Sequence, residues 1–136
     1  MPILNVSVAG KPDLARSSAI ATLLTELTGA HLKKDPAVTA VVINYIEPEH
    51  WFVGGRSLVS QGTGSFWLDI KVTSGTNTKV QLAAYLEAVF TEMSKLLNSV
   101  HDDTYIVVHE VPASAWGFSG TTQEFRYVAG ILESAA

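Results

Sequence analysis

The sequence predicts an α+β fold built from two tandem β-α-β units, and three observations lead to this prediction. Short segments of alternating or β-branched apolar residues, typical of strands, flank longer segments whose apolar residues recur at helical spacing. This order occurs twice within 136 residues. The two copies are offset by 65 positions (116 − 51), because Trp51 and Trp116 are each followed four residues later by a glycine, Gly55 or Gly120.

The first unit begins at the N-terminus with a predicted strand over residues 2–8, which alternates so that one face is apolar. Asp13 then suits the start of a helix. Residues 39–46 are β-branched and almost continuously apolar, which predicts a strand buried on both faces. The apolar helix positions, spaced i, i+3, i+4 and i+7, are Ile20, Leu23, Leu24 and Leu27.

The second unit has the same order. Residues 65–72 alternate cleanly and predict a strand, residues 75–78 supply a turn and a helix cap, and residues 104–111 predict the last strand. The helix between them carries a long apolar stripe: Leu82, Leu86, Val89, Met93, Leu96 and Val100.

We therefore expect a single domain over residues 1–136. Repeat 1 covers about residues 2–55 and repeat 2 about residues 65–120, and a linker joins them over residues 55–64. The tail, residues 121–136, is apolar enough to pack, and a neighbouring subunit is one surface that could receive it.

Composition excludes several classes of protein. A net charge of −4 argues against a nucleic-acid-binding protein, which needs a basic face. No apolar run approaches the ~20 residues of a membrane span. Cysteine is absent and no secretory signal is evident, so a cytoplasmic protein is expected. The high apolar fraction, 47% against 16% charged, suggests an oligomer.

No cofactor is expected. The histidines at 31, 50, 101 and 109 lack metal-ligand spacing, so no metal site is predicted. No glycine-rich phosphate loop is present.

The order β-α-β-β-α-β is compatible with a ferredoxin-like fold as well as with other sheets, because strand order cannot be read from sequence. Two motifs favour another family. Residues 50–55 (HWFVGG) follow a strand and resemble the His-Phe-Gly-Ile-Gly-Gly segment of oxalocrotonate tautomerases, and Pro2 stands where those enzymes begin. The second half, from Tyr105 through Phe118, resembles the C-terminal strand and turn of macrophage migration inhibitory factor. The chain thus resembles the fused, two-repeat branch of the tautomerase superfamily.

The resemblance implies a four-stranded mixed sheet with two helices on one face, assembled as a homotrimer. It also implies a cofactor-independent isomerase, a keto-enol tautomerase acting on a small enol or 2-oxo acid. The catalytic group would be the N-terminal amine of Pro2 after removal of Met1, which a small second residue favours. A neutral amine is a good general base, and burial beside cations lowers an amine pKa. Proline also commonly begins a strand without further role.

The resemblance supplies further candidates. Tyr105 corresponds to a tyrosine that reaches the proline of a neighbouring subunit, although a core aromatic would satisfy the same pattern. Lys34 and Lys71 are candidate substrate-binding cations. For Lys34 a solvated lysine beside Lys33 is the simpler explanation, and Lys71 is equally explained by pairing near Asp69 at the surface. Trp116 and Phe118 are candidate walls of the pocket, for which core packing is the simpler explanation.

The chain also departs from its relatives. Lys11 replaces a substrate-binding arginine, and lysine lacks the bidentate fork of arginine. Residues 39–46 carry no arginine, whereas the single-unit tautomerases have one in this strand. Residues 72–75 also lack the arginine pair that is typical of the dehalogenases and decarboxylases. Tautomerisation is therefore favoured over dehalogenation or decarboxylation. Two alternatives remain: a non-catalytic trimeric binding protein of the same fold, and a ferredoxin-like dimeric small-ligand domain.

Overall fold

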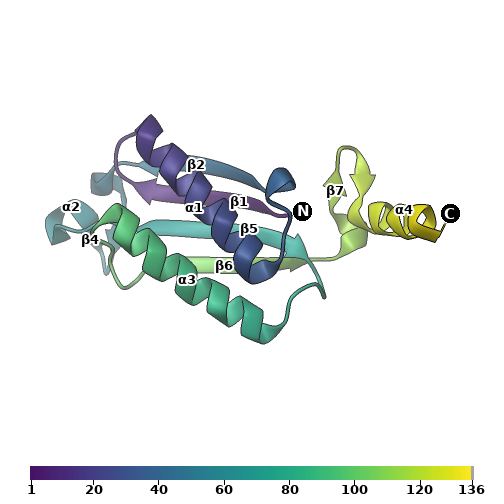
Figure 1. Cartoon of the computed structure of the whole chain (residues 1–136). Helices are drawn as coiled ribbons and strands as arrows, with labels where there is room; N and C mark the ends of the chain where they lie inside the picture. Colours follow the sequence, from purple (N-terminus) through teal and green to yellow (C-terminus); the bar gives the residue numbers. More distant parts are fainter. Residues whose placement is uncertain (136) are drawn as a thin grey trace.

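Residues 1–135 are described by a computed structural model, in which four strands form one mixed sheet (Figure 1). The strand order is β2-β1-β5-β6. β1 is parallel to β2, β5 is parallel to β6, and the two central strands are antiparallel. The bounds of these strands are β1 Ile3–Ala9, β2 Ala40–Ile46, β5 Phe66–Thr73 and β6 Tyr105–Val111.

This strand order decides between the two architectures that the sequence leaves open. Each long helix, α1 (Leu14–Leu32) or α3 (Lys79–Leu97), connects two strands that are direct neighbours in the sheet. A split β-α-β unit of the ferredoxin-like type would place another strand between them. The ferredoxin-like alternative is therefore wrong, and the predicted mixed sheet of two β-α-β units is confirmed.

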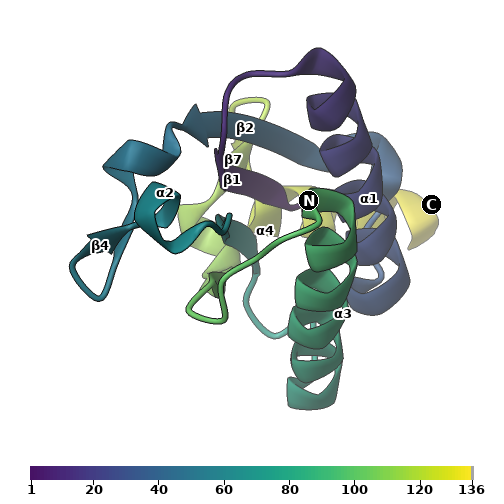
Figure 2. The same cartoon turned by 90° about the vertical axis from the view of Figure 1, so that its left-hand side faces the viewer.

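α1 and α3 lie side by side on one face of the sheet (Figures 1 and 2). The alternation predicted for the two central strands is confirmed, because the inward-facing side chains of β1 and β5 are completely buried under the helices. These core residues are Leu4, Val6, Val8, Phe66, Leu68, Ile70 and Val72. The other face of the sheet carries no helix within the chain, and its apolar side chains, such as Trp67, remain exposed.

The caps of the helices follow from local sequence. The Asp13 side chain accepts a hydrogen bond from the Arg16 amide, as expected for the first turn of α1. Thr78 and Gln81 form a capping box at the start of α3. α1 ends at Leu32, where Lys33 adopts a left-handed conformation with φ 59°.

Two expectations about local structure are wrong. β2 is an edge strand with alternating exposure rather than a strand buried on both faces, because nothing among residues 1–135 covers its second face or its outer edge. Residues 55–64 are not a plain linker. They complete a small hairpin, β3 (Phe52–Val53) with β4 (Arg56–Ser57), and form the short helix α2 (Leu58–Gln61).

The C-terminal tail forms a second hairpin, β7 (Gly117–Phe118) with β8 (Thr121–Thr122), and then helix α4 (Gln123–Ala135). Figure 1 shows β7 and α4 projecting beyond the end of the sheet at which the N-terminus lies. The apolar side of α4 remains exposed in the single chain, and Ala136 lies outside the described residues. No helix among residues 1–135 is both long and apolar enough to cross a bilayer.

A polar contact joins the two long helices inside the core. The Thr28 hydroxyl of α1 lies 2.9 Å from the Tyr85 hydroxyl of α3 and also donates to the Leu24 carbonyl at 2.6 Å. Burial raises the pKa of Tyr85 to about 12, and the Thr28 hydrogen bond partly opposes this rise. Tyr85 is not among the residues of the predicted apolar stripe. A tyrosine is buried where its hydroxyl has a hydrogen-bond partner, and the spacing of apolar residues does not reveal such a partner.

We predict that Tyr85→Phe lowers the free energy of unfolding by about 1 kcal/mol near neutral pH, because one buried hydrogen bond is lost. Above pH 10 the unfolded wild type releases the tyrosine proton while the folded form keeps it to about pH 12, so wild-type stability falls with pH. The variant lacks this loss. Denaturant unfolding from pH 7 to 11 should therefore show the difference between the two proteins shrinking as pH rises. A difference that is constant with pH would contradict the assigned pKa.

Candidate active site

The N-terminus lies in a cavity of about 670 Å³ at one end of the sheet. β1 begins there and β5 ends there, because the two strands are antiparallel and Ile3 pairs with Lys71. The walls come from Met1, Lys34, the turn after β5 and the first turns of α4. Distant parts of both repeats therefore meet around the first residue of the chain.

Positive charge surrounds the terminal amine. Burial, followed by the charges of Lys34 and Arg126, lowers the pKa of the Met1 amine below its ordinary value, while Asp35 acts in the opposite direction. Pro2, the next residue, is buried, and its carbonyl accepts a hydrogen bond from the Ala40 amide at 3.2 Å. The cavity therefore favours a neutral amine at the start of β1.

Lys34 is held toward this cavity. Its ammonium group donates to the Thr76 hydroxyl at 2.8 Å, and Thr76 in turn donates to the Thr73 carbonyl at 2.6 Å. Partial burial lowers the pKa of Lys34. The adjacent Lys33 is exposed, and its ammonium group donates to the Ala30 carbonyl of α1.

Phe118 contributes indirectly to the same region. The Arg126 guanidinium carbon lies 4.2 Å from the centre of the Phe118 ring, a cation–π contact that orients the arginine. The Trp116 carbonyl accepts a hydrogen bond from the Gln123 amide at 2.8 Å and so fixes the start of α4. Neither aromatic residue lines the cavity itself.

Neither Tyr105 nor Lys71 lines the cavity at the N-terminus of its own chain, although Lys71 pairs with Ile3 at that end of the sheet. Tyr105 begins β6 opposite Trp67, at the end of the sheet away from Met1. There it lines a second cavity of about 280 Å³. Lys71 does share a face with Trp67 and Asp69, as expected, but this is the open face of the sheet, where Asp69 bonds to His109 at 2.8 Å.

Arg126 was missed by sequence reasoning, which considered the tail only as a packing segment. A signal was available, because the sequence has arginine only at positions 16, 56 and 126. Arg126 lies in the tail, the segment that belongs to neither predicted repeat. Its Nη1 contacts the Met1 sulfur and donates to Gln123 Oε1 at 3.2 Å. The structure thus adds a second cation beside Lys34.

The predicted correspondence of the two tryptophans is confirmed. The Trp51 carbonyl accepts a hydrogen bond from the Leu58 amide, as the Trp116 carbonyl does from the Gln123 amide, and both distances are 2.8 Å. A two-residue hairpin follows each tryptophan at the same offset. The first hairpin lines the cavity at the start of β5, whereas the second leads into α4 beside the start of β1.

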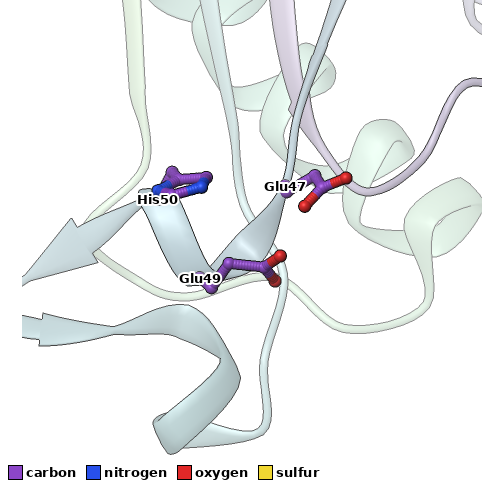
Figure 3. Close-up of side chains that lie close together, drawn as sticks. All are labelled: Glu47, Glu49 and His50. Atoms are coloured by element: carbon purple, nitrogen blue, oxygen red, sulfur yellow. The ribbon is translucent and has the colours of Figure 1, made fainter.

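One group of side chains has the composition of a metal site. The ligand atoms of Glu47, Glu49 and His50 lie within 4.8 Å of one another around a turn (Figure 3). All three residues are exposed, and a hydrogen bond with Glu49 raises the pKa of Glu47. Exposed acidic groups are common without a metal, so we assign none here.

Comparisons with known proteins agree on the architecture. The family model for tautomerase enzymes matches twice, at residues 2–61 and 67–126. Native fused 4-OT is similar in structure, with a TM-score of 0.80 and 21% identity over 90% of this chain and 97% of that chain. No curated protein sequence matches the chain.

Two further solved structures share the fold. A fused 4-OT described as a wild-type symmetric trimer has a TM-score of 0.78 and 17% identity over 90% of this chain and 96% of that chain. A member of the cis-3-chloroacrylic acid dehalogenase family has a TM-score of 0.75 and 22% identity over 93% of this chain and 90% of that chain.

We predict that Lys34→Met raises the pKa of the N-terminal amine, because it removes a neighbouring positive charge. NMR titration of the terminal amine measures this shift. Lys33→Met is the matched control, since Lys33 is exposed and bonds to α1, and it should leave the pKa nearly unchanged. Equal pKa shifts in both variants would show that the charge of Lys34 acts on the terminal amine no more strongly than that of the exposed Lys33.

Proposed function

The chain belongs to the tautomerase enzyme family, and we propose that it is a cofactor-independent tautomerase of small enol or 2-oxo acids that uses the amine of Pro2. The observation that carries this proposal is the N-terminal nitrogen at a cavity that Lys34 and Arg126 both line. Removal of Met1 would convert the Pro2 nitrogen from an amide to a secondary amine. Because Pro2 is buried, the amine would then lie one residue deeper in the protein.

The proposed reaction needs one group that first accepts and then returns a proton. Neutral Pro2 takes the hydroxyl proton of the enol, and the resulting ammonium gives a proton to C3, so that the keto acid forms and the amine is again neutral. Pro2 directly precedes β1, which is paired on both sides, and its carbonyl is bonded to the Ala40 amide, so it is held rigidly, which suits proton transfer over ~3 Å. No cofactor takes part in this sequence.

Lys34 and Arg126 would serve two purposes. Their charges disfavour the ammonium form of the amine and attract the carboxylate of the substrate. Phe118 would hold Arg126 in place, and Trp116 would fix the start of α4. Tyr105 could join the site only from a neighbouring copy, because it lies at the far end of the sheet from Met1 in its own chain. Lys71 pairs with Ile3 at the same end as Met1 but does not line the cavity, so no role in the site is proposed for it within the chain.

A homotrimer is the proposed assembly. The helix-free face of the sheet exposes a group of large apolar side chains, and such a patch usually marks a contact surface. A fused 4-OT of the same fold is described as a trimer. The exposed apolar residues on this face include Ile3, Val42, Trp67, Tyr105 and Val107.

We expect a particle of about 44 kDa in solution, three times 14.6 kDa, measured by light scattering. Trp67→Lys, on the open face, should dissociate it because a charge would be buried in the contact. Leu14→Lys is the control, since Leu14 is 90% exposed on α1, outside the proposed contact. A wild-type monomer at micromolar concentration would contradict the proposed assembly.

We expect Pro2→Ala to lower kcat/KM for phenylenolpyruvate by about 100-fold or more, the usual range for loss of an acid–base group. Wild-type kcat/KM should rise with pH as Pro2 loses its proton. Pro12→Ala, at an exposed proline of the turn before α1, is the matched control and should retain activity.

Retention of Met1 should abolish tautomerisation, because an amide nitrogen is not a base. The two forms can be distinguished by intact mass. Equal activity in a verified Met1-containing preparation would refute the role of Pro2. If the processed protein is inactive yet binds 2-oxo acids, a non-catalytic binding function explains the cavity instead.

A further inference from the structure

We propose that Gln123 and Arg126, both on α4, form a paired donor site that binds the carboxylate of the substrate and makes the protein selective for acids over neutral enols. This inference rests on the proposed function and names the group that its site recognises. Both residues line the cavity at the N-terminus. Neither is among the residues that the sequence resemblance assigns to the site.

Gln123 presents a buried donor that has no partner. The side chain is only 9% exposed, and its Nε2 is buried without any hydrogen bond within the described chain. The amide orientation is determined by Arg126, which donates to Gln123 Oε1 at 3.2 Å and cannot accept. The amino group of Gln123 is therefore the unpaired end of the side chain.

A buried donor without an acceptor destabilises a protein, so such groups are rare and need an explanation. A ligand oxygen in the cavity would supply the missing acceptor. The first turn of α4, where Gln123 lies, also carries the positive end of the helix dipole. Both features favour an anionic oxygen over a neutral donor group.

Arg126 supplies the charge next to this donor. Its guanidinium is stacked on Phe118 and is half-buried, and no carboxylate lies within ion-pair distance of it among residues 1–135. A guanidinium has several N–H donors in one plane, which matches the two oxygens of a carboxylate. One carboxylate can thus accept from Arg126 and from Gln123 Nε2 together.

The first repeat shows that the fold itself does not require these two polar groups. With the offset of 65, Gln123 corresponds to Leu58, which is completely buried, and Arg126 corresponds to Gln61. Gln61 Nε2 donates to the carbonyls of Val53 and Arg56, both at 3.0 Å, and so closes its hairpin. Among the equivalent positions, only Gln123 and Arg126 of the second repeat line a cavity.

The surroundings favour a single carboxylate. Glu124 is the one acidic residue that lines the cavity, and it is exposed, whereas Lys34 and Arg126 are both half-buried. The cavity therefore has positive charge for one carboxylate. A 2-oxo monoacid fits this balance.

The test compares phenylenolpyruvate with its methyl ester in wild type, Gln123→Leu and Arg126→Gln. Leucine is the residue that the first repeat has at the equivalent position, so the substitution fills the same kind of space. We expect each variant to lose roughly 10- to 100-fold in kcat/KM for the acid, mainly through KM, as for a lost hydrogen bond to a charged group. Turnover of the ester should change by less than roughly threefold on the same reasoning.

Thermal unfolding distinguishes recognition from a structural role. Gln123→Leu removes an unpaired buried donor and also the acceptor of one Arg126 N–H, which water can replace at the half-buried guanidinium, so the midpoint should stay the same or rise while use of the acid falls. An equal loss for acid and ester would overturn the proposal, because it would show a general defect. Unchanged kinetics with the acid would overturn it as well.

Binding of an unreactive acid separates this inference from the proposed chemistry. 3-Phenylpropanoate and 3-phenylpropanamide are titrated calorimetrically into wild type, Pro2→Ala and Gln123→Leu. We expect the acid, and not the amide, to bind wild type and Pro2→Ala alike and to bind Gln123→Leu more weakly. If Pro2 is not the base, Pro2→Ala keeps the turnover of wild type, yet this binding pattern remains. If Gln123→Leu binds the acid as wild type does, the carboxylate site is refuted whatever the role of Pro2.

Discussion

The antiparallel pairing of β1 with β5 at the centre of the sheet determines where every other part of the molecule lies. Val8 pairs with Phe66 and Ile3 with Lys71, so the two strands run the full length of the sheet in opposite directions. Each strand carries its own helix and parallel partner, and right-handed crossovers then place α1 and α3 on the same face. The apolar side chains between them form one core, and the opposite face is left for another surface to cover.

The same pairing gives the chain two related ends. The hairpin of the first repeat lies at the start of β5, and α4 of the second repeat lies at the start of β1. At β5 the chain continues through Ser65 into Phe66, so every backbone nitrogen there is an amide. A basic backbone nitrogen can exist only at the start of β1, which explains why the larger cavity and the cations matter at that end.

Polar groups are distributed unequally between these ends. In the first repeat, Leu58 completes the packing and Gln61 satisfies backbone carbonyls, and both serve stability. In the second repeat, Gln123 retains an unpaired buried amide and Arg126 lies on an aromatic ring instead of a carboxylate. Buried polar groups without hydrogen-bond partners tend to occur at functional sites, and the unpaired Gln123 amide of this chain lies at its candidate site.

The sequence by itself determined the secondary structure of the two repeats, because strand alternation and helical spacing depend only on neighbours in the chain. Leu4, Val6 and Val8 were predictable core residues, as was the match of Trp51 with Trp116. Strand order was not predictable, since it depends on contacts between distant segments. Without the strand order, the position of β2 at the edge of the sheet was also unknown, and its apolar sequence indicated a strand buried on both faces. The candidate site divides in the same way. Lys34 was predictable from resemblance, whereas Arg126 and Gln123 meet the N-terminus only because the second hairpin places the first turns of α4 beside the end of β1, more than 120 residues away in the sequence.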